Sequence, residues 1–273
     1  MAYSSGKSAV ITGAGSGIGR ALALQLNREG CAVYLSDIRE KTLAETLQLL
    51  PRKDVAADTR VLDVADREAM HAWAEDIASQ QGHVDIVVNN AGVALMDTVE
   101  DGSYEDLEWL MGINFWGVVY GTKAFLPLLR KAPQGHLVNI SSVFGLFGVP
   151  TQSAYNAAKF AVRGYTEALR QEMAGTNVHV CCVHPGGIKT NIVLNARGGD
   201  DDSTPQQRGD RFQQIARTTA EGAAAQIITA VERHKKRLLI GLDAHIMSLV
   251  VRLFPVAYPA VLAKLAPAEP DKI

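Results

Sequence analysis

The chain has 273 residues, of which 47% are hydrophobic and 21% charged, so it can bury the core of an ordinary globular protein. Its formal net charge is −2, which gives no electrostatic reason to expect nucleic acid or an anionic membrane as a partner. The start of the chain does not have the pattern of a secretory leader, so its three cysteines predict reduced thiols and a cytoplasmic location. Neither a CxxC pair nor HExxH occurs, and no metal is expected.

Short runs rich in valine and isoleucine alternate with longer runs of helical periodicity. The strand-like runs are residues 7–13, 31–37, 59–64, 83–90, 136–142, 177–185 and 237–241. The helical runs are residues 17–30, a run ending near residue 50, 66–80, about 103–131, about 152–174 and 219–234. This alternation predicts an α/β fold in a single domain, with a doubly wound seven-stranded parallel sheet and helices on both faces.

Two segments depart from this rhythm. Residues 195–210 are polar, glycine-rich and acidic, and we expect a mobile loop at the carboxyl edge of the sheet, where ligands bind. The tail after residue 241 is apolar, and Pro255 and Pro259 exclude one continuous helix. We therefore divide the domain into a catalytic part, 1–241, and an apolar extension, 242–273. A lid or an oligomer contact is favoured for this extension over contact with a membrane.

A glycine cluster, TGAGSGIG, lies between the first predicted strand and the first helix. Glycine allows a tight turn and a close approach of the backbone to a pyrophosphate, and the N–H groups of the following helix point toward the phosphates. Asp37 ends the second strand, where a carboxylate binds the adenosine ribose and repels the extra phosphate of NADP. Alternatively, Asp37 caps the following helix, and Arg39 could reach a 2′-phosphate.

Tyr155 and Lys159 are four residues apart at the start of a predicted helix and share one face of it. An ammonium group one turn away favours the phenolate form of tyrosine, which is otherwise a poor base at neutral pH. Alone this spacing is common on protein surfaces. Ser142, however, ends the fifth strand thirteen residues before Tyr155 and brings a hydroxyl donor to the same strand end.

With these motifs the sequence resembles the short-chain dehydrogenase/reductase family, whose members have a Rossmann fold. The matching segments are TGAGSGIG at 12–19, the Asp63–Val64 pair, NNAG at 89–92, Asn114, NISS at 139–142, YNAAK at 155–159 and HPGGIKT at 184–190. One departure is His184, where the family more often has asparagine, and we assign it a local hydrogen bond.

The resemblance implies four catalytic residues. Tyr155 would be the general acid/base, and Lys159 would lower its pKa and hold the nicotinamide ribose. Ser142 would hydrogen-bond the substrate oxygen. Asn114 would anchor a water linking Lys159 to solvent. Other interpretations stay open: Asn114 as a packing residue inside its helix, Asp63 as a helix cap, and Ser141 in place of Ser142.

The resemblance also implies a cofactor site. Its residues are Gly13, Gly15, Ser16, Gly17, Ile18, Gly19, Asp37, Asp63, Val64, Asn90, Ala91, Gly92, Tyr155, Lys159, Pro185, Gly186, Ile188 and Thr190. In this family an acidic residue at the position of Asp37 accompanies NAD, whereas NADP users often have a basic residue in the glycine loop, where this chain has Ser16. The expected cofactor is therefore NAD, with NADP as the less favoured possibility.

The expected substrate site is mainly apolar. It comprises residues 93–96, 143–147 and 192–194, without an obvious Arg or Lys to hold a carboxylate or phosphate. This composition favours a neutral, lipophilic secondary alcohol or ketone as the small-molecule substrate. The alternatives are an NADPH-dependent carbonyl or ketoacyl-type reductase and a non-catalytic dinucleotide sensor. The resemblance further implies a homodimer or homotetramer.

Overall fold

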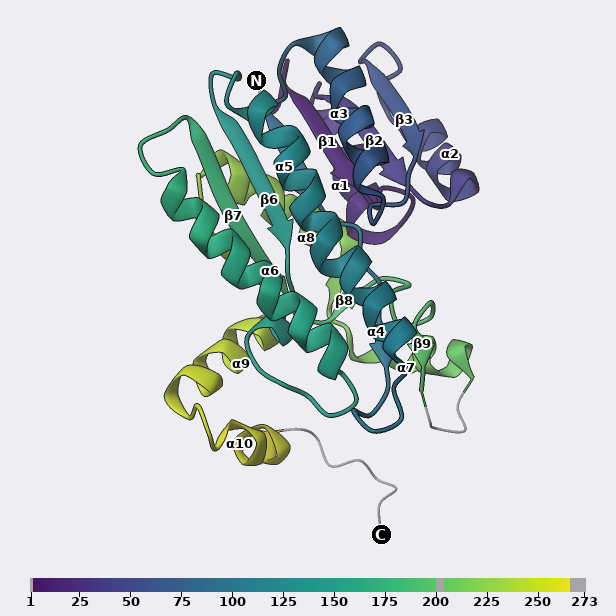
Figure 1. Cartoon of the computed structure of the whole chain (residues 1–273), viewed down its shortest axis with the longest axis vertical. Helices are drawn as coiled ribbons and strands as arrows, with labels where there is room; N and C mark the ends of the chain where they lie inside the picture. The colour runs from purple at the N-terminus through teal and green to yellow at the C-terminus, as the bar shows by residue number, and fades with distance from the viewer. Residues whose placement is uncertain (1, 200–203, 266–273) are drawn as a thin grey trace.

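The computed structural model describes residues 2–199 and 204–265, with side chains as far as residue 262. The predicted seven-stranded sheet is confirmed: all its strands are parallel, in the order β11-β7-β6-β4-β1-β2-β3 (Figure 1). The strands are β1 (Ser8–Thr12), β2 (Ala32–Asp37), β3 (Ala57–Val61), β4 (Ile86–Asn89), β6 (Gly135–Ile140), β7 (Val178–Pro185) and β11 (Arg237–Ile240). The strand order reverses between β1 and β4, and this switch point opens a crevice at the carboxyl edge.

Helices cover both faces of the sheet, as predicted. One face carries α1 (Gly17–Arg28), α2 (Glu40–Leu49) and α8 (Ala220–Glu232), and the other α3 (Arg67–Gln81), α5 (Gly117–Leu129) and α6 (Ser153–Glu172). Each set buries its apolar stripe in a separate core cluster. Leu22 and Ile227 are fully buried on the first face, and Trp73 meets the ring of Phe125 edge-on, at 5.3 Å between centroids, on the second.

The third strand differs from the predicted 59–64. β3 is the outermost strand, and most of its side chains are exposed, so its composition carries little burial signal. Leu62 and Val64 belong to the connection after the strand, where they enter the core. The apolar residues on which the predicted strand was based therefore belong largely to this connection and not to the strand.

The long helix predicted over 103–131 is divided into three parts. The first is α4 (Tyr104–Met111), followed by a π-helical turn over Gly112–Trp116 and then α5. A π-turn inserts an extra residue into the helical ladder and re-aims the side chains around it. Asn114 lies in this turn and is fully buried.

The segment predicted as a loop over 195–210 is partly regular. Arg197–Gly198 form the short strand β9, which pairs with β5 (Leu95–Met96), and α7 spans Pro205–Ile215. A capping box starts α7: the Thr204 hydroxyl accepts from the backbone N–H of Gln207, whose side chain accepts in return from the backbone N–H of Thr204. The polar composition of α7 concealed this helix. Residues 200–203 lie outside the described residues.

The apolar tail forms α9 (Leu242–Leu253) and α10 (Tyr258–Leu265), separated by a turn that contains Pro255. The predicted interruption is confirmed. The inner side of α9 contacts β11 and the 3₁₀ turn Val143–Gly145, below the carboxyl edge of the sheet in Figure 1. Two further short strands, β8 (Ile188–Lys189) and β10 (Thr218–Thr219), pair beside this edge. Within the described residues, no helix is long and apolar enough to cross a membrane.

Candidate active site

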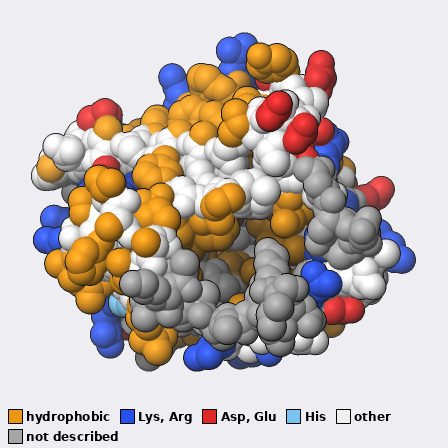
Figure 2. Space-filling model, turned by 90° about the horizontal axis from the view of Figure 1, so that it is seen from below, with side chains coloured by type: hydrophobic (Ala, Val, Ile, Leu, Met, Phe, Trp, Pro, Cys, Tyr) orange, Lys and Arg blue, Asp and Glu red, His pale blue; other side chains and the backbone are white. Residues whose placement is uncertain are grey.

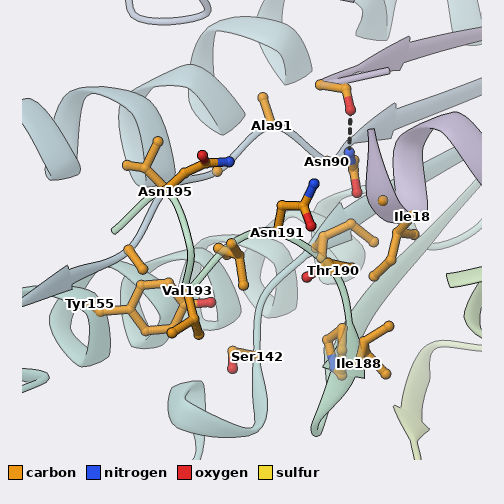
Figure 3. Close-up of a pocket in the computed structure, with 18 of the residues that line it drawn as sticks. Ile18, Asn90, Ala91, Ser142, Tyr155, Ile188, Thr190, Asn191, Val193 and Asn195 are labelled. Carbon is orange, nitrogen blue, oxygen red and sulfur yellow. Dashed lines mark hydrogen bonds between the residues drawn. The ribbon is translucent and has the colours of Figure 1, made fainter. Parts of the chain in front are cut away.

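A single cavity of about 590 Å³ at the carboxyl edge of the sheet collects most of the predicted site residues. All the predicted cofactor residues line it except Gly15 and Gly19, and so do Ser142, Tyr155 and Lys159. Figure 3 shows Tyr155 and Val193 toward one end of this cavity and Ile18 and Asn90 toward the other. Asn114 does not line it.

The glycine loop brings three chain segments into close contact. Gly13 and Gly17 have φ of +65° and +53°, which side chains other than glycine rarely allow. A Cβ atom on Gly13 would lie 2.8 Å from Ala91 Cα, and one on Gly19 would overlap the Gly13 carbonyl. Gly19 therefore serves packing between loop and helix.

The helix after this loop could bind an anion. α1 begins at Gly17, and the side chain of Ser16 does not cap it, so the N–H groups of its first turn remain available at the cavity. A phosphate group placed there would receive these N–H groups and the positive end of the helix dipole. The residues present thus fit the pyrophosphate of a dinucleotide.

Asp37 is buried at the end of β2 and faces the glycine loop. Its Oδ2 accepts from the Gly15 N–H at 2.9 Å, its Oδ1 accepts from the Arg39 N–H at 3.0 Å, and the Arg39 Nε is 3.7 Å from Oδ1. The N-cap of α2 is Arg39, so the interpretation of Asp37 as that cap is wrong. Arg39 also reaches Ser16 Oγ, at 3.4 Å from its Nη2.

Asp63 is likewise not a helix cap. Its Oδ1 accepts from the Ala65 N–H at 2.9 Å, whereas Asp66 is the N-cap of α3 and accepts from the Ala69 N–H. Asp63 and Val64 both line the cavity near Asp37, at the end expected for adenosine.

Ser142 and Ser141 have different local roles. The Ser141 hydroxyl donates to the Lys159 carbonyl at 2.8 Å and so ties the strand end to α6. The Ser142 Oγ accepts from the Phe144 N–H at 3.1 Å, so its own proton can be donated to the Tyr155 oxygen or to a ligand oxygen. This difference supports Ser142 as the donor to substrate.

Tyr155 and Lys159 are buried on one face of α6, and the Lys159 Nζ lies 5.6 Å from the centre of the Tyr155 ring. Burial raises the pKa of Tyr155 to about 12, and the hydrogen bond with Ser142 acts in the opposite direction. Burial lowers the pKa of Lys159 to about 8. The Lys159 ammonium donates to the Ile140 carbonyl at 3.1 Å. A lowering of the Tyr155 pKa by Lys159 remains a prediction.

Asn114 holds the segment beside Tyr155 and Lys159. Its Nδ2 donates to the Val93 carbonyl at 2.9 Å, and its Oδ1 accepts from the Val93 N–H at 2.8 Å. A Cβ atom on Gly92 would lie 3.2 Å from Asn114 Oδ1 and 3.5 Å from Lys159 Nζ, so glycine keeps a small gap between the two side chains. The predicted link through water remains a prediction, while the backbone contact is an additional role.

His184 makes the local hydrogen bond that was predicted for it. Its Nδ1 pairs with the Ser142 carbonyl at 3.0 Å, and burial lowers the pKa of the imidazole to about 4, so the ring is neutral at physiological pH. The three cysteines are free and buried. The described residues contain no group of three or more His, Cys, Asp or Glu side chains that could hold a metal ion.

The substrate end of the cavity is apolar, but its lining differs from the prediction. Val93, Ala94, Val143, Phe144, Ile192 and Val193 line it as expected, whereas Leu95, Met96, Gly145, Leu146, Phe147 and Leu194 do not. Leu146 and Phe147 instead pack against the tail. The prediction missed Gln152, Asn191 and Asn195, Phe212 and Ile215 of α7, and Asp243 and Met247 of α9. Elsewhere in the cavity it missed Ile38, Leu62, Ile113, Ile140 and Gly187. The apolar periodicity of the tail was the signal that could have identified Met247.

Comparison with known proteins agrees with this geometry. The family model described as short chain dehydrogenase matches residues 7–200. The chain belongs to the short-chain dehydrogenase family. It is 46% identical over 267 residues, 96% of either chain, to a Mycobacterium tuberculosis protein named as an oxidoreductase, SadH. It is 37% identical over 186 residues to 3-ketodihydrosphingosine reductase of Bacteroides thetaiotaomicron, covering 68% of this chain and 65% of that protein.

Among solved structures, a short-chain dehydrogenase/reductase from Burkholderia phymatum in complex with NAD matches with a TM-score of 0.81 and 28% identity over the whole of both chains. Levodione reductase matches with a TM-score of 0.80 and 27% identity, covering 89% of this chain and 98% of that one. The protein is thus an oxidoreductase of the family that acts on CH–OH groups with NAD(P).

Proposed function

We propose that this protein interconverts a secondary alcohol and a ketone, with NAD(H) as its cofactor and a neutral, lipophilic compound as its substrate. One observation supports this above all: a single cavity joins Asp37 and the glycine loop to Ser142, Tyr155 and an apolar end. Asp37 and the glycine loop suit the cofactor, Ser142 and Tyr155 suit proton transfer to or from the substrate oxygen, and the apolar end suits a lipophilic substrate.

Preference for NAD is argued from Asp37. Its carboxylate is buried against the glycine loop, where it can accept hydrogen bonds from ribose hydroxyls and disfavours a second phosphate by repulsion. A relative of known structure was solved with NAD. Arg39, exposed beside Asp37, is the observation that favours an NADP-dependent reductase instead.

The proposed chemistry uses four side chains. The nicotinamide, when bound, supplies or accepts the hydride. Tyr155 gives its phenol proton to the carbonyl oxygen in reduction and takes a hydroxyl proton in oxidation, while Ser142 donates a hydrogen bond to the same oxygen. Lys159 stabilises the phenolate through its positive charge. Asn114 holds the loop at Val93 beside them.

The substrate class is argued from the apolar end. Val143, Phe144, Val193 and Met247 line it, and arginine is absent from the described residues there. Such a lining favours binding of a substrate with a large apolar surface and offers no bidentate partner for a carboxylate or phosphate. Two similar proteins, 3-ketodihydrosphingosine reductase and levodione reductase, are named as reductases of ketones.

A homodimer or homotetramer in the cytoplasm completes the proposal. Trp116 of the π-turn and Phe160 of α6 are both substantially exposed, as residues at a subunit contact would be in an isolated chain. Analytical ultracentrifugation of the wild-type protein and a Trp116→Glu variant would test this contact. The variant is expected to dissociate, and an unchanged sedimentation coefficient would place the contact elsewhere.

The deciding experiment measures nicotinamide reduction with NAD and NADP in parallel, over a panel of water-soluble and lipophilic secondary alcohols. Turnover with NAD, lost in Asp37→Ala and kept in Arg39→Ala, is the expected result. Turnover with NADP alone, lost in Arg39→Ala, would reverse the assignment of the cofactor. Binding of a dinucleotide without turnover of any alcohol or ketone would favour a non-catalytic sensor.

A further inference from the structure

Helix α9 is apolar on two opposite faces. Because successive helical residues are rotated by about 100°, Ala244, Met247 and Val251 share one face, and Leu242, Ile246, Leu249 and Leu253 share the opposite one. The first face packs against the 3₁₀ turn after β6 and against α10. Packing within this chain therefore explains only one of the two apolar faces.

The second face is exposed over its whole length. The exposed fraction is 69% at Leu242, 58% at Leu249 and 62% at Leu253, and the apolar surface continues through the turn to Val256, which is 89% exposed. We call this surface the outer face: Leu242, Ile246, Leu249, Leu253, Phe254 and Val256. Figure 2, which looks onto the carboxyl edge of the sheet, shows hydrophobic side chains gathered around a hollow and extending away from it on one side. A contiguous apolar surface of this kind marks an interaction site.

The outer face adjoins the substrate end of the cavity. Met247, on the inner face of the same helix, lines that cavity, and Tyr258 of α10 hydrogen-bonds the backbone of Gly148 at 3.2 Å in the loop after the 3₁₀ turn. The tail thus forms the wall between the apolar cavity and the outer face. Whatever covers the outer face lies next to the substrate's binding site.

The flank of this face is basic. His245 and Arg252 lie on one side of α9, with Ser248 between them, and Arg237 reaches Ser248 Oγ at 3.4 Å. Burial lowers the pKa of Arg237, and the nearby positive charges of Arg163 and Arg252 add to this effect. Glu167, which pairs with Arg163 at 3.1 Å, opposes it, so Arg252 and Arg237 carry the unpaired positive charge of the flank. The acidic residue of α9, Asp243, is turned inward onto the Gly187 N–H. An apolar strip with a basic flank is the pattern of a helix that lies on anionic lipid.

We propose that the outer face binds the surface of a bilayer containing anionic lipid, so that the apolar end of the cavity lies beside the lipid phase. The charge of the flank favours this occupant over a second copy, which would bring the same positive charges to the contact. The sequence favoured a lid or a subunit contact for the tail. Met247, on the inner face of α9, lines the cavity, which is compatible with a lid. The further suggestion that a lipophilic substrate enters from the lipid rests on the proposed function.

Vesicle flotation with the full chain tests this proposal. The probes are vesicles of phosphatidylcholine alone and of phosphatidylcholine with phosphatidylglycerol. The variant Leu249→Glu/Leu253→Glu changes two exposed outer-face residues, and Leu49→Glu is the control, because Leu49 is exposed to nearly the same fraction, 56%, on α2 at the other edge of the sheet. Arg252→Gln removes one charge of the flank. Circular dichroism and thermal unfolding verify that each variant is folded.

We expect the wild-type protein and the control to float with anionic vesicles and the double variant to partition about tenfold more weakly or worse. Arg252→Gln should weaken binding to anionic vesicles more than to neutral ones. Absence of flotation by the wild-type protein with both compositions would overturn the proposal. So would dissociation of an oligomer in the double variant with unchanged flotation, since the outer face would then be a contact between copies.

A turnover assay separates this inference from the proposed function. A water-soluble secondary alcohol should be oxidised equally by the wild-type protein and the double variant, because none of the outer-face residues lines the cavity. Flotation without turnover of any alcohol would remove the proposed substrate and leave the lipid contact in place. Turnover without flotation would support the proposed function and overturn the lipid contact.

Discussion

The Asp243 carboxylate accepts a hydrogen bond from the Gly187 backbone N–H, at 2.7 Å, and so joins the start of α9 to the loop after β7. The glycines around it make this possible. A Cβ atom on Gly186 would overlap the Asp243 carboxylate, and so would one on Gly241. The resemblance to the family predicts that this loop lies at the nicotinamide end of the cofactor site, so the tail would help to position the residues predicted to hold the cofactor.

The first prediction concerns this bond. Asp243→Ala leaves the Gly187 N–H without its partner, and we expect the Kd for NADH to rise about tenfold, corresponding to loss of one partly buried charge-assisted hydrogen bond. Asp243→Asn keeps an acceptor oxygen and should stay within about threefold of the wild type. Titration by NADH fluorescence measures both. Equal Kd values for wild type and Asp243→Ala would show that the bond does not position the loop.

The second prediction concerns Tyr155. Tyr155→Phe removes the proton that is transferred but keeps the aromatic packing against Phe144, whose ring centre is 6.2 Å away. We expect turnover to fall by about a thousandfold or more while the Kd for the cofactor changes little. Tyr104→Phe is the control, because Tyr104 is exposed and does not line the cavity. Loss of cofactor binding together with turnover would show that Tyr155 has a different role.

Much of this site could be predicted from sequence because its residues follow strand ends. Gly13, Asp37, Asn90 and Ser142 each lie at or just after the carboxyl end of a parallel strand, and such ends meet along one edge of the sheet. The spacing between Tyr155 and Lys159 placed both on one helical face. Local spacing and strand topology are therefore sufficient to predict that these residues meet in one cavity.

The rest of the site depends on tertiary contacts that spacing does not encode. Met247 and Phe212 reach the cavity from helices that follow the predicted core motifs, and their position depends on how α7 and α9 fold back. The direction of the Tyr155 pKa shift depends on full burial of the phenol, which the Tyr-Lys spacing alone does not reveal. The π-turn at Asn114 replaces part of a helix with an irregular ladder that periodicity does not show.

The third prediction concerns the size of the substrate. Met247 lines the apolar end from α9, so Met247→Trp should fill part of that space and lower kcat/KM for bulky alcohols about tenfold or more, with small alcohols less affected. Leu249→Trp, two residues further on the outer face, is the matched control and should leave both values unchanged in a lipid-free assay. A uniform loss for small and bulky alcohols would mean that Met247 supports the fold rather than the pocket.

The last prediction concerns acid stability and begins at the opposite edge of the sheet. His136 is buried at the start of β6, and its ring centre lies 5.1 Å from that of His179 and 5.2 Å from that of His234, two rings that stack on each other at 4.0 Å. The Nε2 of His136 pairs with the Tyr3 hydroxyl at 2.7 Å. Burial, together with the charges of His179, His234 and Lys7, lowers the pKa of His136 to about 3.

A histidine whose pKa is lower in the folded state than in the unfolded chain contributes stability that is present above the unfolded pKa and is lost as pH falls toward the folded value. For His136 this range extends from about pH 6.5 down to about pH 3, because the unfolded imidazole takes up a proton that the folded one resists. We expect the free energy of unfolding to fall by roughly 2–4 kcal/mol across this pH range from this residue alone.

His136→Gln, which keeps a polar partner for Tyr3 but does not titrate, should flatten the dependence of the free energy of unfolding on pH. Urea unfolding curves at several pH values measure this dependence. His245→Gln, at an exposed position, is the control and should leave the pH dependence unchanged. An identical slope in the wild type and in His136→Gln would assign the loss of stability in acid to other groups. The buried His184 would then be the next residue to replace.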